Sequence, residues 1–272
     1  MEKIMRSLIY VDVAKEQYRV KLNHWLYAVH VPESISKFRP YVSQYAFYNA
    51  LPVPPLGEQF GTVRMQLTEH YWQVNPMDVS MAVNVFTETF PTEVLIWQGN
   101  MPENAIALNY EGDEARSAKV ENCNPFVFAF LPISWEEDLK GAGRTMADGP
   151  NYRWNFALHY PDGVSVETGD QWFYEKFVPA FLEIPEATRM VTSKIIKEIN
   201  DCPMDRVVEI WFEGPDQWSA AMEKAKSIEP PEWAQEETFP YLKPYQNIMG
   251  VFVADNISSD NLNNHRGYIT MR

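Results

Sequence analysis

The feature that most constrains the fold is an eight-residue segment that occurs twice. The first copy, Trp25–Pro32, reads WLYAVHVP and the second copy, Trp172–Pro179, reads WFYEKFVP, at an offset of 147 residues (from 25 to 172). Both copies have Trp, Tyr, Val and Pro at the same places, so the chain is expected to use one structural unit twice. The first copy has His30 where the second has Phe177, which favours polar chemistry in the first copy alone.

Two further markers follow in the same order. The tetrapeptide ETFP occurs at 88–91 and at 237–240, an offset of 149. The segment 63–68 can be aligned with 208–213 at an offset of 145, although a slip of one residue gives a rival register. We therefore expect two repeats, 1–115 and 116–272, and an insertion at about 140–170 that has no counterpart in the first repeat.

Hydrophobic periodicity predicts the same order of elements in both halves. The first half is expected to contain strands at 8–13, 41–50, 61–68 and 93–98, with helices at about 14–37 and within 75–88. The helix at 14–37 is expected to stop or kink near Pro32. The second half is expected to contain strands at 126–133, 190–199, 206–212 and 247–253, with helices around Trp172 and at 216–228. This is the βαββαβ order of a ferredoxin-like unit, so the fold class is α+β.

Composition narrows the class of ligand. The net charge of -14 disfavours nucleic acid and anionic membrane surfaces as partners, and a small neutral or apolar ligand fits better.

Cys123 and Cys202 are the two cysteines and form no CxxC pair, so neither a disulfide framework nor a thiolate metal site is expected. The N-terminus lacks a signal-peptide apolar core and no apolar run is long enough for a membrane span, so the expected location is the cytoplasm.

The motifs resemble those of a known family. A helix that reads NHWLYAVHVPE at 23–33 and leads into a strand at 42–45 resembles the EthD-like branch of the dimeric α+β barrel superfamily. The resemblance implies two four-stranded antiparallel sheets that pack face to face around a cavity, here both supplied by one chain. It leaves the reaction open, because related barrels include cyclases, isomerases, cofactor-free oxygenases and haem enzymes.

Strand alternation predicts which side chains face that cavity. If Val63, Met65 and Leu67 face the helices, then Arg64, Gln66 and Thr68 face inward. In the aligned strand, Val208, Ile210 and Phe212 would pack against helices, and Glu209, Trp211 and Glu213 would face inward. The alternative is a strand with one solvated face.

His30 and His70 are the candidate acid and base, because imidazole exchanges protons near neutral pH. The resemblance places His30 at the cavity mouth; the alternative is a histidine that caps the helix end. His70 would point inward, with Tyr71, Glu69 and Arg64 orienting the histidines or stabilising an enolate. The alternative for this run is a polar cap at the strand end.

Further aromatic and polar side chains are expected to bind substrate. Tyr27 has Tyr174 as its equivalent, so it can also be read as framework, and His159 lies in a segment that could form a lid or a surface hairpin. The expected substrate-binding residues are Tyr27, Gln66, Trp72, His159, Trp211 and Glu213.

The sequence therefore predicts a cofactor-independent lyase, dehydratase, cyclase or isomerase that acts on a small aromatic or carbonyl compound. This interpretation requires that His30 or His70 borders an interior cavity. A cofactor-free monooxygenase or haem enzyme of the same fold, and a non-catalytic binding protein, stay open as alternatives. No metal site is expected. Whether the protein binds haem stays open, and so does whether it forms a homodimer.

Overall fold

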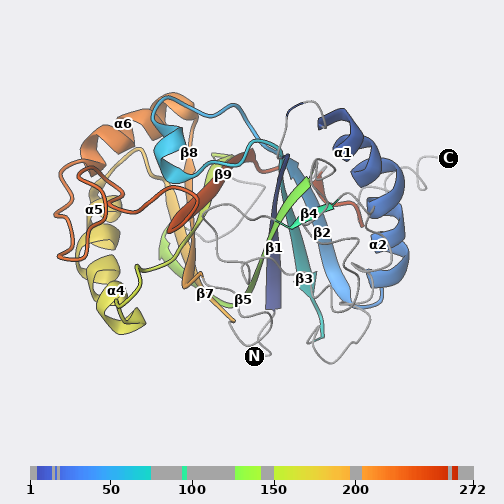
Figure 1. The fold of residues 1–272 in the computed structure, drawn as a ribbon, viewed down its shortest axis with the longest axis horizontal. Coiled ribbons are helices and arrows are strands. Elements are labelled where there is room, and N and C mark those ends of the chain that lie inside the picture. The colour runs from blue at the N-terminus through green and yellow to red at the C-terminus, as the bar shows by residue number, and fades with distance from the viewer. Residues whose placement is uncertain are drawn as a thin grey trace.

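The computed structural model describes residues 5–13, 16, 19–74, 94–96, 126–141, 150–196, 204–256 and 259–262. The first repeat forms an antiparallel sheet of β1 (Met5–Val13), β2 (Val42–Asn49), β3 (Gln66–Trp72) and the first half of β5 (Phe126–Lys140), in the order β2-β3-β1-β5 (Figure 1). The first strand thus lies between the third and the fourth. This is the strand order of a ferredoxin-like unit.

The second repeat has the same topology. Its strands are β6 (Tyr152–Leu158), β7 (Arg189–Ile195), β8 (Arg206–Phe212) and β9 (Ile248–Ala254), in the order β7-β8-β6-β9. All of their pairings are antiparallel. The predicted fold class, two tandem ferredoxin-like repeats, is therefore confirmed.

Two contacts join the sheets into one barrel. The second half of β5 continues past the first sheet and pairs with β7, with Glu136 opposite Ser193 and Asp138 opposite Val191. At the other edge, Ala50 after the end of β2 forms a bridge with Val253 of β9. The strand order therefore closes on itself, and the two sheets share one interior.

The helices confirm the sequence repeat. α1 (Arg19–Trp25) continues through a π-helical turn, η2 (Leu26–His30), into α2 (Val31–Phe38). The second repeat has α4 (Val166–Trp172), a π-helical turn η6 (Phe173–Phe177) and α5 (Val178–Glu183). Each π turn begins directly after the repeated tryptophan, so the offset of 147 residues holds for the whole helical segment.

The first helix was predicted to stop or kink near Pro32, and it does not stop there. Pro32 is the second residue of α2, and Pro179 is the second residue of α5. Each proline therefore lies inside a longer helical segment, just after a π-helical turn. A proline and a π turn are both known places where a helix bends, since each interrupts the regular ladder of hydrogen bonds.

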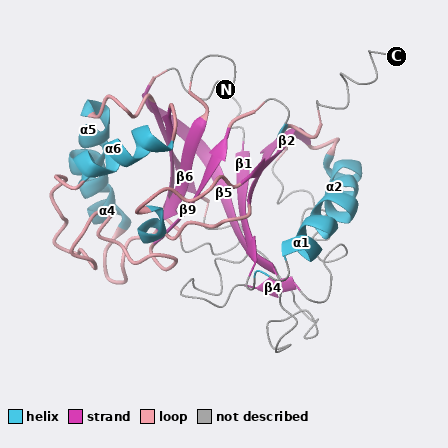
Figure 2. Ribbon diagram, turned by 90° about the horizontal axis from the view of Figure 1, so that it is seen from above, coloured by secondary structure: helices cyan, strands magenta, loops and turns pink. Residues whose placement is uncertain are grey.

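The helices cover the outer faces of the two sheets (Figures 1 and 2). One hydrophobic cluster lies between the first sheet and α1 and α2, and includes Leu26, Phe38 and Trp72. A second lies under α4, α5 and α6 (Pro215–Ala225). A third joins strand residues of both repeats, such as Leu8 and Val207, and forms the apolar part of the barrel interior. Within the described residues, no helix is both long enough and apolar enough to cross a membrane.

The structure corrects the expected strand assignment. The segment 126–133, expected to begin the second repeat, completes the first sheet, and the stretch 140–170 contains β6, which takes the place of β1 in the second sheet. β4 (Val94–Ile96), where a fourth strand was expected, pairs in parallel with β5 outside the main strand order. Strand propensity indicates that a segment is extended but does not indicate its partner.

Three predictions lie outside the described residues. They are the boundary near residue 115, the helix within 75–88 and the first ETFP segment.

The first residues of equivalent strands in the two repeats correct one of the expected sequence alignments. β1 and β6 start at 5 and 152, and β2 and β7 start at 42 and 189, both at the offset of 147. β3 and β8 start at 66 and 206, an offset of 140. The expected offset of 145 for this strand pair was therefore wrong.

Candidate functional site

The centre of the barrel contains two arginines at equivalent positions of the repeats, Arg6 in β1 and Arg153 in β6. Arg6 Nη2 lies 2.5 Å from Glu209 Oε2, and Arg153 Nη1 lies 2.7 Å from Glu69 Oε1 and 2.6 Å from Glu209 Oε1. Glu69 and Glu209 are themselves equivalent, since each is the fourth residue of its strand, β3 or β8. All four side chains are at most 2% exposed. We call these four residues the central ion cluster.

Two further carboxylates lie at the ends of the central ion cluster. Glu136 Oε1 is 3.0 Å from Arg6 Nε, and Asp255 Oδ1 is 3.0 Å from Arg153 Nε. Burial alone would lower the pKa of Arg6, but the carboxylates of Glu209, Glu136 and Glu69 raise it above its ordinary value. Both arginines therefore remain charged, and four carboxylates surround two cations.

The central ion cluster corrects the expected nature of the interior. An apolar, aromatic-lined pocket was predicted, whereas charged side chains occupy the centre and apolar residues surround them. Tyr10 donates a hydrogen bond to Asn155, and Trp211 Nε1 donates one to Asp255 Oδ2 at 2.6 Å. The inward orientation predicted for Glu209 and Trp211 is confirmed.

The faces predicted for β3 were wrong. Glu69 points into the barrel, whereas Gln66, Thr68 and His70 lie opposite helix-facing residues of β1 and β2. Val63 belongs to the interior cluster and Met65 to the helix-facing one, so the alternation breaks between them. β3 begins only at Gln66, and counting faces from residue 63 therefore gave the opposite answer.

His70 consequently does not border the barrel interior. Its ring stacks on Tyr45 at 4.6 Å between centroids, makes an edge contact with Phe38 of α2 at 5.7 Å, and is 1% exposed. Trp72 lies on the same face, with its Nε1 donating to Ser7 Oγ at 2.9 Å. Tyr71, on the other face, donates to Glu69 Oε2 at 3.2 Å. His70 is thus a packed residue of the helix-facing core.

A second polar group lies under the π-helical turn η2 of the first repeat. The Tyr27 hydroxyl donates to Asn49 Oδ1 at 3.0 Å, and its ring makes an edge contact with Phe47 at 5.5 Å. Gln66 pairs with Asn49 in the sheet, is 1% exposed, and its amide forms no hydrogen bond within the described part of the chain. We call Tyr27, Asn49 and Gln66 the amide site.

The equivalent place in the second repeat is closed by an ion pair. Arg206, the first residue of β8 as Gln66 is of β3, donates from Nη2 to Asp170 Oδ1 at 2.7 Å and from Nη1 to Thr192 Oγ1 at 3.0 Å. Its guanidinium also lies 4.5 Å from the ring centroid of Phe173. Tyr174, the equivalent of Tyr27, donates to Glu137 Oε2 at 2.7 Å. The buried polar side chain at this place is therefore hydrogen-bonded in the second repeat, whereas in the first repeat it has no partner among the described residues.

His30 is the last residue of the π-helical turn η2. Its side chain lies outside what the structure describes, so its catalytic role stays a prediction. Short π-helical segments occur frequently at functional sites. The described neighbour Tyr27 has a pKa raised by burial, so its hydroxyl is protonated at neutral pH.

The remaining predicted residues lie apart from the amide site. His159 Nδ1 is 3.0 Å from Asp205 Oδ2 in the second repeat. Glu213 is exposed in the turn that follows β8. The Arg64 side chain is 56% exposed and forms an ion pair with Glu58.

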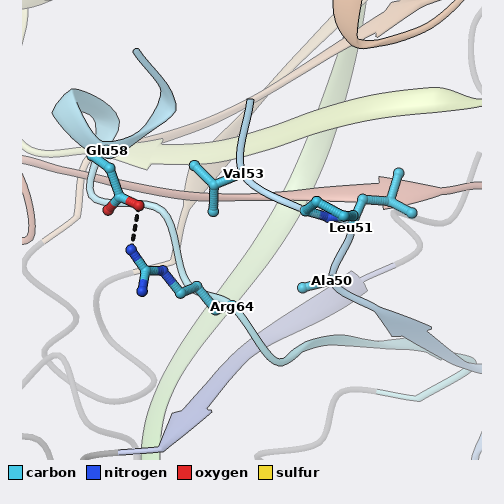
Figure 3. A pocket seen from close by; sticks show the side chains of 6 residues that line it. Ala50, Leu51, Val53, Glu58 and Arg64 are labelled. Atoms are coloured by element: carbon cyan, nitrogen blue, oxygen red, sulfur yellow. Dashed lines mark hydrogen bonds and ion pairs between the residues drawn. The ribbon is translucent and has the colours of Figure 1, made fainter. Parts of the chain in front are cut away.

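Arg64 lines a surface pocket (Figure 3), which we call the seam pocket. It lies where the end of β2 meets β9 and has a volume of about 440 Å³. Its lining residues are Ala50, Leu51, Pro52, Val53, Glu58 and Arg64.

The described side chains contain no group of three or more His, Cys, Asp or Glu residues that could hold a metal ion. A haem ligand must be accessible, and His70, which is 1% exposed and stacked on Tyr45, is not accessible; this leaves haem binding through the other histidines as an open alternative.

Comparison with known proteins gives one family match and several structural neighbours. Residues 2–103 match the chalcone isomerase N-terminal domain. This range includes β1, η2, β2 and β3, and hence the whole amide site. It covers less than half of the chain, and none of the curated proteins compared with the chain matches it.

The structural neighbours are distant in sequence. An anthrone oxidase-like protein has 8% identity and a TM-score of 0.48, with 93% of this chain and 91% of that chain covered. The putative chlorite dismutase TA0507 has 11% identity and a TM-score of 0.46, with 93% and 96% covered. A putative monooxygenase from Lactobacillus acidophilus has 10% identity and a TM-score of 0.35, with 84% and 89% covered.

The sequence contains a signal for the central ion cluster, although neither arginine belongs to one of the repeated motifs. Applying the offset of 147 to the first strand aligns Arg6 with Arg153, the one arginine of each strand, β1 and β6. Asn49 of the amide site had no such signal, because its role depends on the strand pairing that places it beside Gln66.

Proposed function

We propose that this protein is a cofactor-independent acid/base enzyme, an isomerase or lyase, that acts on a small aromatic carbonyl compound at the amide site. The observation that carries the proposal is the buried amide of Gln66, which has no hydrogen-bond partner among the described residues. An unsatisfied buried amide costs about 1–3 kcal/mol, so its retention favours a role in binding. The equivalent Arg206 of the second repeat is bonded.

The amide site supports chemistry that passes through an enolate. In this proposal His30 takes the proton of a substrate hydroxyl group as its oxygen adds to the carbon–carbon double bond of an aromatic enone, and His30 then gives that proton to the carbon next to the carbonyl. The Gln66 N–H donates a hydrogen bond to the carbonyl oxygen, where negative charge develops in the transition state. The rings of Tyr27 and Phe47, in edge contact, provide an aromatic wall for the substrate ring.

The family match supports the choice of an isomerase. The chalcone isomerase N-terminal domain aligns with the repeat that contains η2 and the amide site. A chalcone is an aromatic ketone, and therefore belongs to the proposed substrate class. The His-x-Pro motif at 30–32 further leads us to propose that the chain falls in the EthD-like branch of the α+β barrels.

Turnover of aromatic enones tests this function, and it is measured as the loss of their ultraviolet absorption. His30→Gln is expected to lower kcat by about 100-fold or more, as does removal of a general acid/base. His24→Gln changes an exposed histidine of α1 and is the matched control, expected to keep the wild-type rate. Wild-type turnover in His30→Gln would refute the assignment.

The same experiments separate the alternatives. Tight binding of enones without turnover by the wild-type protein would indicate a binding protein. A Soret band in the purified protein would indicate haem, whereas the proposed chemistry requires none. A homodimer stays a prediction from the resemblance, and light scattering of the purified protein tests it.

A further inference from the structure

We propose that the seam pocket recognises a carboxylate group of the substrate, and that Arg64 is its ligand. This inference rests on the proposed function, because it specifies which aromatic carbonyl compounds the amide site takes. It predicts an aromatic acid that carries its carboxylate at the end remote from the reacting carbonyl.

The seam pocket lies next to the amide site. Arg64 precedes Gln66 by two residues, and Ala50 directly follows Asn49. The Cα atoms of residues two apart in a chain can be separated by at most about 7 Å, a distance that a single aromatic acid can span. The pocket volume of about 440 Å³ is also in the range of small-molecule sites, about 300–1,000 Å³.

The pocket combines an apolar wall with one cation. Leu51, Pro52 and Val53 form the wall, and the guanidinium of Arg64 lies across from them beside Glu58 (Figure 3). The backbone of Arg64 is fixed, because its N–H donates to Asp12 Oδ2 at 2.9 Å and its carbonyl accepts from Arg19 Nη1 at 3.1 Å. Its side chain, at 56% exposure, is accessible to a ligand. A planar guanidinium binds a carboxylate through two parallel hydrogen bonds.

The ion pair with Glu58 can be exchanged for a ligand. Arg64 and Glu58 are 56% and 55% exposed, and a pair this open to water contributes little to stability. A ligand carboxylate can therefore displace Glu58, whose own carboxylate returns to water. Because the chain has a net charge of -14, an anionic ligand needs a local cation of this kind.

Backbone strain near the pocket supports a functional role. Leu56 and Tyr245 have positive φ angles of 69° and 62°, which bulky residues rarely adopt. The Tyr245 hydroxyl donates to Thr62 at 3.3 Å, and the charges of both Glu58 and Arg64 act on it. Such strained residues gather at binding sites, where the surrounding structure holds them in place.

Calorimetric titration of the full chain with 4-acetylbenzoate, whose carboxylate and ketone lie at opposite ends of one aromatic ring, and with its methyl ester tests the proposal. The acid is expected to bind more tightly than the ester. Arg64→Gln is expected to weaken binding of the acid about 10-fold or more and leave the ester unchanged, since the lost interaction is a charge-assisted pair. Glu58→Gln is expected to tighten binding of the acid, because it removes the competing carboxylate.

Arg39→Gln is the matched control, since Arg39 is an exposed arginine at the far end of α2, and it is expected to leave both affinities unchanged.

Equal affinity of wild type and Arg64→Gln for the acid, or no binding of the acid by wild type, would overturn the proposal. Tighter binding of the matched amine probe, 4-(aminomethyl)acetophenone, than of the acid would overturn it in favour of Glu58 as the ligand. Loss of turnover in His30→Gln together with an unchanged KM for acids in Arg64→Gln would refute the carboxylate subsite alone. Binding of the acid through Arg64 without turnover of any enone would refute the enzyme function alone.

Discussion

Arg6 of the first repeat lies 2.5 Å from Glu209 of the second, Nη2 to Oε2, in the middle of the barrel. The reverse contact, Arg153 to Glu69, spans 2.7 Å, so each repeat supplies the cation for the other's carboxylate. Burying these charges costs free energy that the mutual attraction must offset. A packing of the two sheets that separated these pairs would leave buried charges without partners, which is strongly unfavourable.

Arg153→Met is expected to lower the free energy of unfolding by about 3–5 kcal/mol, because it leaves buried carboxylates without their cation. Urea unfolding followed by circular dichroism measures this change. Lys226→Met, which breaks an exposed pair with Glu223, is the control and is expected to cost at most about 1 kcal/mol. Equal losses in the two variants would contradict the structural role of the cluster.

Glu136→Gln is expected to affect stability in a pH-dependent way. Burial raises the pKa of Glu136 above its ordinary value of 4.5, and although Arg6 lowers it, Glu209 and Glu69 raise it further. The folded protein thus holds this proton more tightly than the unfolded chain does. The stability from this carboxyl is present below its unfolded pKa and is lost as pH rises through its folded pKa.

The variant should therefore gain stability relative to wild type as pH rises from about 4 to neutral, since the neutral amide does not titrate. Urea midpoints of both proteins across this range measure the difference. A variant that instead becomes relatively less stable with rising pH would show that the pairing with Arg6 outweighs the burial.

Gln66→Leu is expected to raise the free energy of unfolding by about 1–3 kcal/mol, because it removes a buried amide that has no partner in the described structure. Turnover should fall at the same time, by about 100-fold, if Gln66 stabilises the enolate. Gln73→Leu changes an exposed glutamine and is expected to shift stability by at most about 0.5 kcal/mol. A destabilised Gln66→Leu would indicate that the amide is satisfied in solution.

Gly61→Ala is expected to destabilise the protein more than Gly163→Ala. Both glycines have positive φ, 60° and 87°, which costs an alanine about 1–2 kcal/mol. At Gly61 the added Cβ would also lie 2.3 Å from Ile248 O and 2.6 Å from Tyr245 N, whereas at Gly163 nothing lies within 4 Å. Thermal unfolding of the two variants compares them directly, and equal melting temperatures would contradict this packing.

The repeat could be predicted from the sequence because its markers are rare residues at one spacing. The tryptophans and prolines of 25–32 and 172–179 located both helical segments correctly. The face of His70 could not be predicted, because the irregular chain between Val63 and Met65 shifts the alternation before β3 begins. A local pattern contains no information about such a shift.

Contacts between residues far apart in the sequence also could not be predicted, and the candidate site depends on such contacts. Glu69 was expected to support His70, yet its partner is Arg153, 84 residues away and in the other repeat. The segment 140–170 was expected to be an insertion because its glycines and aspartates punctuate a real strand, β6. Gln66 and Tyr27 were predicted to bind substrate in the barrel interior, and the structure instead brings them together on the helix-facing side.

The length of β5 has a consequence for dividing this chain into fragments. Its first half completes the first sheet against β1, and its second half pairs with β7 of the second sheet. A fragment cut before Phe126 would leave β1 paired with β3 but unpaired along its other edge, and a fragment that starts after Lys140 would expose the edge of β7. Unpaired edges of this kind promote aggregation. The duplicated sequence has thus become a single folding unit, and its halves should be recovered in native form only when they are expressed together.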